Sequence, residues 1–319
     1  MTREHDAFLF VYFANGDGPD VEQIRFAVSD GPDPTQWWVL ADGSPVLRSD
    51  VGEGGARDPF VLRDRRTGRF HLLATDLRAV PDGDWARAVR HGSRSLVVWH
   101  SDDFVHWSEP QLTPIAPPNA GNAWAPKAVW DDGEQRWLVF FAAALYAEED
   151  SRESATHQRI LVARTDDFTS FGPAEVALDR GHDVIDAAYL QAGDAWYRFS
   201  ADSLSDDPTI RSQHVSQEVG SDPTAGDFTL VANEIDAHAL RRGEGPAPFS
   251  GLDGDGHYLL VDEFELRGYQ LFHAQDPSTG SWRHLADARL PPGARHGSVL
   301  PITAAERDRL ITTFGATRA

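Results

Sequence analysis

The 319-residue sequence has no cysteine and only one lysine, Lys127. The lack of cysteine excludes disulfide bonds and thiolate chemistry. Positive charge is also scarce, since 29 basic residues face 50 acidic ones and leave a formal net charge of −21. Such a chain repels phosphate backbones and anionic lipid surfaces, so nucleic acid and membranes are excluded as partners.

Long apolar runs are missing as well. Mean hydropathy is −0.42, and no segment approaches the roughly 18 apolar residues that a membrane-spanning helix needs. Residues Met1 to Asp6 are polar and charged and lack the apolar centre of a signal peptide. We therefore expect a cytoplasmic protein, or a secreted one if a leader has been removed.

Aromatic and aliphatic residues, in contrast, are plentiful and occur in short runs. The chain has 10 Trp and 17 Phe and is 41% hydrophobic, which is ample for a packed core. Runs such as 136–141 and 258–261 lie beside Asp- and Gly-rich connectors, 131–133 and 253–256, of the kind that form tight hairpin turns. Helical periodicity is hard to find. The pattern predicts an all-β chain, and no Ser- or Pro-rich linker divides residues 1–319 into more than one domain.

The strand groups recur as units of four strands. If one unit is assembled from both ends of the chain there are five, at intervals of 66, 62, 58 and 52 residues, starting at Asp58, Trp124, Asp186, Glu244 and His296. Repeats of this length are typical of a β-propeller, whose innermost strands line a central channel. We expect a single five-bladed ring, closed where C-terminal strands from 296–302 and 310–314 pair with the N-terminal blade and remove free edges. The alternative is a two-sheet sandwich.

Three carboxylates occupy predicted starts of inner strands: Asp58, Asp186 and Glu244. An acid within an apolar strand is costly to desolvate unless it is paired or functional. Two carboxylates that flank one pocket, with a third to adjust a pKa, are the groups that glycosidic bond hydrolysis requires. These three residues are therefore the candidate catalytic groups.

Five motifs at these positions resemble those of the five-bladed propellers of glycoside hydrolase family 43, in family order and over nearly the whole chain. They are RDPF at 57–60, NAWAP at 122–126, DVIDA at 183–187, GEGP at 243–246 and RHGSVLP at 295–301. The resemblance implies that Asp58 is the general base, Asp186 the residue that modulates a pKa, and Glu244 the general acid.

The resemblance also implies roles for residues beside the carboxylates. His296 corresponds to a histidine near the central channel that in several members helps to hold a hydrated Ca²⁺ or Na⁺, so a cation bound through water is expected there. No organic cofactor is needed. Arg57 is expected to contact the substrate, and Trp124, which opens an inner strand beside the channel, is the candidate for stacking on a sugar.

Two features depart from the family pattern. The family often has Asp or Glu after Trp-Ala-Pro, where this chain has Lys127. We favour a surface change at this position over the alternative of altered ligand contacts or a missing acid in the pocket. The partial blade of residues 8–45 also places Asp58 in the second unit of the chain, which is typical of only some subgroups.

We therefore expect an inverting, exo-acting glycosidase of the α-L-arabinofuranosidase or β-xylosidase type, which removes terminal pentosyl or furanosyl residues from an oligosaccharide or glycoside. Inversion requires room for a water molecule, so Asp58 and Glu244 should face each other across one pocket at roughly 6.5–9.5 Å. One alternative is an enzyme like the related invertases and fructosyltransferases, which residues 57–59 fit although no Asn-Asp-Pro motif lies upstream. The other is a non-catalytic glycan-binding propeller.

Overall fold

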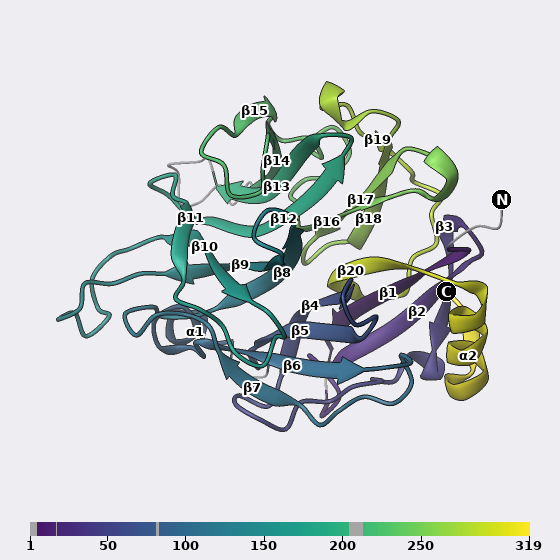
Figure 1. The fold of residues 1–319 in the computed structure, drawn as a ribbon, viewed down its shortest axis with the longest axis horizontal. Coiled ribbons are helices and arrows are strands. Elements are labelled where there is room, and N and C mark those ends of the chain that lie inside the picture. The colour runs from purple at the N-terminus through teal and green to yellow at the C-terminus, as the bar shows by residue number, and fades with distance from the viewer. Residues whose placement is uncertain (1–4, 17, 81–82, 204–212) are drawn as a thin grey trace.

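The computed structural model describes residues 5–16, 18–80, 83–203 and 213–319. They form five antiparallel β-sheets arranged as blades around a central channel (Figure 1). The prediction of an all-β, five-bladed propeller is confirmed.

Each blade contains four strands or more, which follow one another outward from the channel. The blade that joins both ends of the chain contains β20 (Ala294–Ile302), β1 (Ala7–Ala14), β2 (Ile24–Asp30), β3 (Asp33–Leu40) and β21 (Ala316–Arg318). The others, in chain order, are β4 (Ala56–Arg63), β5 (Phe70–Asp76), β6 (Ser95–Ser101) and β7 (Gln111–Pro114); β8 (Trp124–Asp131), β9 (Arg136–Ala144), β10 (Gln158–Thr165) and β11 (Glu175–Leu178); β12 (Val184–Ala192), β13 (Ala195–Ser203), β14 (Gln213–Gly220) and β15 (Thr229–Ala232); and β16 (Glu244–Ser250), β17 (His257–Glu263), β18 (Gly268–Ala274) and β19 (Arg283–His284).

The hydrophobic core is divided among the spaces between neighbouring blades. Five clusters of buried apolar side chains each join two adjacent blades. One of them packs Leu9 and Phe26 against Leu72 and Trp99 of the next blade. Because every blade is buried on both faces by its neighbours, the inner strands β4, β8, β12, β16 and β20 are held in contact around the channel.

The ring is closed by β20, which pairs with β1 in an antiparallel register. Ser298 lies opposite Val11, and Leu300 lies opposite Leu9. Gly297 approaches β1 so closely that a Cβ atom would stand 2.1 Å from the carbonyl oxygen of Val11, so only glycine fits there. The predicted pairing of the C-terminus with the N-terminal blade is confirmed. In addition, β21 pairs with β3, so C-terminal segments cover both edges of this blade.

Two segments are helical where the sequence suggested otherwise. Residues 310–314, expected to form a strand, belong to α2 (Ala304–Phe314), and residues 85–91, in a chain expected to be all-β, form α1 (Trp85–His91). At the start of α2, Thr303 and Glu306 form a capping box, which satisfies the free backbone N–H groups and outweighs the β-branched residues at the other end. Short 3₁₀ helices complete the structure at Ala41–Gly43, Leu252–Gly254 and Pro277–Thr279. Neither α-helix in the described ranges has the length and apolarity needed to cross a membrane.

The pairing of β20 with β1 predicts that truncation after Pro292 abolishes soluble folding. This truncation removes the inner strand of one blade, opens the ring and leaves the apolar β1 as a free edge. A matched truncation after Gly315 removes only β21, and we expect it to yield a soluble protein with a lower melting temperature. Size-exclusion chromatography and circular dichroism measure both outcomes. A monomeric, cooperatively folded protein ending at Pro292 would contradict the closure.

Candidate active site

The inner strand of every blade carries a β-bulge at the same height in the channel. In β4, for example, Arg57 pairs with Thr75 but Phe60 pairs with Leu73, so the inner strand has one residue more than its partner. The same shift interrupts the four other inner strands. In each bulge one residue has a left-handed backbone: Asp58 (φ 52°), Ala125 (51°), Asp186 (58°), Gly245 (57°) and His296 (29°). Bulges of this kind redirect a side chain out of the regular alternation of the strand.

The bulges define two sets of positions around the channel. The bulge level comprises Asp58, Ala125, Asp186, Gly245 and His296, and the rim level, one residue earlier in each strand, comprises Arg57, Trp124, Ile185, Glu244 and Arg295. The repeat predicted from sequence therefore began one residue too early in two blades. The residue that is structurally equivalent to Asp58 is Ala125 rather than Trp124 in one of them, and Gly245 rather than Glu244 in the other. Side chains of both levels line one pocket of about 300 Å³, and the predicted catalytic residues all lie in it.

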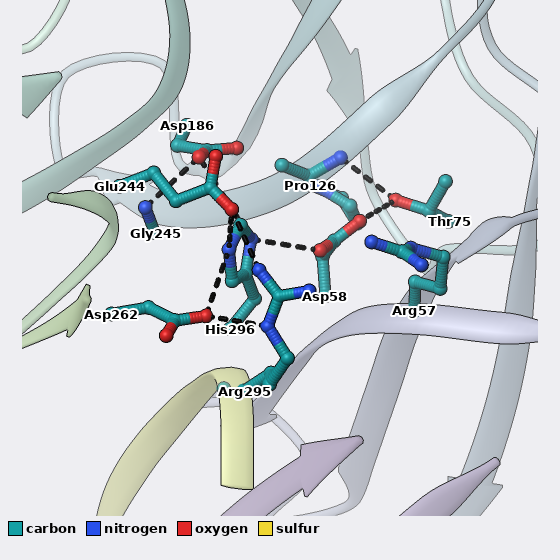
Figure 2. Close-up of polar contacts among 12 residues, drawn as sticks. Arg57, Asp58, Thr75, Pro126, Asp186, Glu244, Gly245, Asp262, Arg295 and His296 are labelled. Carbon is teal, nitrogen blue, oxygen red and sulfur yellow. Dashed lines mark hydrogen bonds and ion pairs between the residues drawn. The ribbon is translucent and has the colours of Figure 1, made fainter. Parts of the chain in front are cut away.

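His296 stands at the centre of this pocket, between the predicted base and the predicted acid (Figure 2). Its Nδ1 lies 3.1 Å from Asp58 Oδ1 and 3.8 Å from Asp186 Oδ2. Its Nε2 lies 3.0 Å from Glu244 Oε1 and 3.4 Å from Asp262 Oδ2. Asp58 and Glu244 therefore face opposite nitrogens of one imidazole ring, an arrangement that favours a wide separation of the two carboxylates.

The surrounding carboxylates keep His296 positively charged. Burial favours the neutral ring, but the negative charges of Glu244 and Asp186 and a hydrogen bond to Asp58 outweigh it and raise the pKa of His296 to about 10. An imidazolium donates from both nitrogens and has no lone pair left. Both ring nitrogens point at carboxylate oxygens, Nδ1 at Asp58 and Nε2 at Glu244, so neither is free to face a metal ion or a metal-bound water. The expected hydrated cation at His296 does not fit this arrangement, although Asp186, Glu244 and His296 offer ligand atoms within 4.8 Å of one another.

Arg295 and Asp262 complete the contacts around Glu244, and sequence analysis assigned no role to either. Arg295 Nη2 donates to Glu244 Oε1 at 2.7 Å, and its Nε donates to Asp262 Oδ2 at 2.7 Å. Asp262 comes from β17, at the end of the apolar run 258–261, and is fully buried. Its position next to that run was the only sequence signal that it belongs to the site.

The two remaining carboxylates differ in their affinity for a proton. Burial, together with the charges of Glu244 and Asp58, raises the pKa of Asp186 to about 6, although His296 opposes this shift. Burial also favours the neutral form of Glu244, but His296 and Arg295 outweigh it and lower its pKa. The family resemblance implied that Asp186 modulates a pKa. In this structure Asp186 itself has the higher affinity for a proton, because the two cations touch Glu244 directly.

Asp58 is held as an anion. Burial alone would raise its pKa, but the hydrogen bond and charge of His296, the charge of Arg57 and a hydrogen bond from Thr75 together hold the pKa well below its usual range. Thr75 Oγ1 donates to Asp58 Oδ2 at 2.6 Å and accepts from the backbone N–H of Ala125 at 2.8 Å. The bulges of β4 and β8 are thus linked through Thr75, which fixes the orientation of the Asp58 carboxylate (Figure 2).

Aromatic side chains form the wall of the pocket beside Trp124. Trp85, from α1, is 47% exposed and lies edge-to-face against Trp124, with ring centroids 6.1 Å apart. The Arg57 guanidinium stacks on Trp85 and pairs with the buried Glu22 at 2.5 Å, so it is held in place rather than free. Trp124 therefore lies where the prediction placed a sugar-stacking residue. Sequence analysis missed Trp85, which lies between β5 and β6 and outside the five motifs.

Lys127 is buried, contrary to the surface position that we favoured. Its side chain is 5% exposed and lies in the channel, two residues after the bulge of β8. The extra residue of the bulge brings this side chain to the channel side of the strand. The chain therefore has a buried basic side chain at a position where we expected a change on the protein surface.

Comparisons with known proteins agree with this architecture. A sequence profile described as a probable glycosyl hydrolase domain, related to glycoside hydrolase family 43, matches residues 4–308. An α-L-arabinofuranosidase of Bifidobacterium longum subsp. longum is 28% identical over 288 residues, which cover 78% of this chain and 26% of that protein. The chain thus spans about a quarter of the length of this curated relative.

Solved structures share the fold at low sequence identity. A thermostable family-43 glycoside hydrolase is 19% identical, with a TM-score of 0.56 over 79% of this chain and 82% of the other. An endo-1,4-β-xylanase of Bacteroides thetaiotaomicron is 14% identical, with a TM-score of 0.58 over 93% of this chain and 99% of the other. At this level of identity the likeness extends to the fold alone.

The contacts of His296 predict that its ring remains doubly protonated far above the ordinary histidine pKa of about 6.5. Nitrogen-15 NMR of the labelled protein at pH 8 should show an imidazolium signal that is absent from the His296→Asn variant. Asn tolerates the positive φ of this position, so the variant keeps the bulge. Because the folded-state pKa is raised, the stability that His296 contributes is complete below about pH 6.5 and is lost as pH rises toward 10. A ring that titrates near pH 6.5 would contradict this charge assignment.

Proposed function

The chain belongs to the family of probable glycosyl hydrolase domains related to glycoside hydrolase family 43, and on this premise we propose that it is an inverting, exo-acting glycosidase for terminal pentosyl or furanosyl residues. The observation that carries the proposal is the placement of Asp58 and Glu244 on opposite sides of His296 in one pocket. Each carboxylate has a different set of partners, and their protonation states follow from those partners.

Asp58 is suited to deprotonate the attacking water. Its anionic form is stabilised by His296 and Thr75, each of which contacts a different carboxylate oxygen. A carboxylate oxygen has two acceptor positions, so both contacts leave room for a hydrogen bond from water. The proton removed from water during attack at the anomeric carbon would reside on Asp58.

Asp186 and Glu244 act as a pair that holds one proton. Their ligand atoms lie within 4.8 Å, and two carboxyls so close titrate as a unit. We assign the proton to Asp186, because Arg295 and His296 stabilise the anion of Glu244. Within the described residues these cations contact only Oε1 of Glu244, which leaves Oε2 to receive the shared proton and pass it to the departing oxygen.

The pocket supports a small terminal sugar as substrate. Its volume of about 300 Å³ lies at the lower end of the range for ligand sites, and the five bulges close it on the channel side. Trp85 and Trp124 provide aromatic faces on which a sugar ring can stack. The similarity to an α-L-arabinofuranosidase supports a furanosyl residue as the substrate.

A substrate panel tests the proposal. Aryl α-L-arabinofuranosides, β-xylosides and galactofuranosides should be assayed beside sucrose, with the anomer of the first product identified by proton NMR. We expect release of a pentose with inverted configuration. Cleavage of sucrose would favour the invertase-like alternative, and glycan binding without turnover would favour a binding propeller.

Substitution of the two carboxylates should have different consequences. Asp58→Asn should abolish turnover of every substrate, because no other group activates the water. Glu244→Gln should reduce kcat strongly on a substrate with a poor leaving group but only weakly on a dinitrophenyl glycoside, which needs little protonation. The comparison requires kcat for both variants on both substrates. Losses that are equal in the two variants whatever the leaving group would contradict the assignment.

The shared proton predicts the pH dependence. Activity needs the proton on the Asp186–Glu244 pair, so kcat/KM should fall as pH rises through about 6, the pKa of Asp186. Asp186→Asn removes the negative charge that opposes ionisation of Glu244, so the fall should move to lower pH. Asp64→Asn, which changes a buried carboxylate at the far end of β4, is the matched control and should leave the position of the fall unchanged. An Asp186→Asn profile that falls at the wild-type pH would contradict the pairing.

A further inference from the structure

Lys127 lies in the channel directly behind the catalytic carboxylates. Two residues after each bulge the inner strands present a further set of side chains to the channel, which we call the second level: Phe60, Lys127, Ala188, Ala247 and Ser298. They line a small cavity of about 40 Å³. The pocket is lined by the rim and bulge levels, so this cavity lies on the other side of the carboxylates, along the channel.

The ammonium of Lys127 has few direct partners. Nζ donates to the carbonyl oxygen of Pro126 at 3.3 Å and lies 5.9 Å from the centre of the Phe60 ring. Among the residues that the structure describes it forms no direct ion pair, and the other second-level side chains carry no charge. A buried ammonium in such surroundings is costly unless a nearby field stabilises it. The opposite charges that interact with it are Asp58 and Asp186, on the bulge level next to it.

The balance of charge around the pocket favours a further cation. Four buried or nearly buried carboxyls meet there: Asp58, Asp186, Glu244 and Asp262. The cations in direct contact with them are His296 and Arg295, from β20, whereas Arg57 pairs with Glu22 and acts on Asp58 through its charge alone. Two cations cannot neutralise four carboxylates. Lys127 supplies a third positive charge, and a proton on the Asp186–Glu244 pair accounts for the fourth carboxyl.

We propose that Lys127 is a positioning residue for the proposed reaction. Its ammonium is the cation of the channel and stabilises Asp58 and Asp186 from the side opposite the substrate pocket. Burial lowers the pKa of Lys127 and outweighs the charges of the two carboxylates, which raise it, so the ammonium depends on those charges. A channel that already holds an ammonium repels a second cation, so neither Ca²⁺ nor Na⁺ is needed or bound beneath the pocket. Only the catalytic consequence of this inference rests on the proposed glycosidase function.

The catalytic test replaces Lys127 with a side chain of similar volume that has no charge. Lys127→Met should move the fall of kcat/KM to higher pH by ~0.5–1 unit, because without the ammonium the Asp186–Glu244 pair binds its proton more tightly. The change should appear in kcat with KM nearly unchanged, since Lys127 does not touch the substrate pocket. Lys127→Arg retains a cation and should restore the wild-type pH of the fall. Phe60→Leu, at the same level, controls for altered packing and should not move it. An unshifted Lys127→Met profile would overturn the proposal.

A second test needs neither activity nor a substrate. The melting temperature of the wild-type protein is measured with CaCl₂, NaCl or EDTA, at an ionic strength held constant with tetramethylammonium chloride, whose cation is too large for the cavity. We expect no specific change, whereas Lys127→Ala, which opens space behind the carboxylates, should be stabilised by Ca²⁺. Stabilisation of the wild-type protein by Ca²⁺ or Na⁺, reversed by their removal, would overturn the proposal even if Lys127→Met failed to fold. Absence of all glycosidase activity would refute the proposed function but leave this test intact.

Discussion

One extra residue in each inner strand determines where every charged group of the site lies. The bulge places a left-handed residue at the same height in all five blades, and three of those residues are Asp58, Asp186 and His296. Outside glycine, such a backbone costs on the order of 1 kcal/mol or more at each position and persists only where surrounding structure imposes it. Here hydrogen bonds between blades supply that constraint: Thr75 accepts from the N–H of Ala125, and the N–H of Gly245 donates to Asp186 at 2.9 Å. The closed ring holds the strained strands in place, so fold and site are stabilised by the same contacts.

The second constraint is electrostatic, and it follows from the first. Once the bulges direct several carboxylates toward one axis, their mutual repulsion must be offset within a space from which water is largely excluded. The offset is arranged in layers along the channel: Arg295 at the rim, His296 at the bulge level and Lys127 behind it. Removing one partner of such a buried network costs far more than the network contributes as a whole, because it leaves an uncompensated charge. This explains why a lysine-poor, strongly acidic chain retains a buried lysine at this position.

Sequence reasoning found the carboxylates because bulge residues leave a local signature. Asp58 and Glu244 stand beside Pro or Gly, which suit the distorted backbone, and the spacing of the motifs matches the length of a blade. The same reasoning failed for Lys127, because regular strand alternation does not apply after a bulge and the register of the partner strand is not visible in the sequence. Asp262 was missed for another reason, since its contact with Arg295 joins residues of two different blades. The helix over 304–314 was predictable in principle: Thr303 and Glu306 have the spacing of a capping box, but the β-branched run near its end drew the assignment toward a strand.

Asp186 binds a proton more tightly than Glu244, although Glu244 is the proposed general acid. Both carboxyls are largely removed from solvent, with side chains 7% exposed for Asp186 and 14% for Glu244, and burial raises the pKa of each. What distinguishes them is that Arg295 contacts Glu244 and not Asp186. A leaving-group oxygen that approaches Oε2 of Glu244, the oxygen that Arg295 and His296 leave free, accepts a hydrogen bond only from the protonated carboxyl and so favours the proton there. Substrate binding would therefore transfer the shared proton toward Glu244 at the moment when a general acid is needed. In the proposed mechanism, arrival of the substrate protonates Glu244, and Asp186 stores the proton rather than acting only as a source of repulsion.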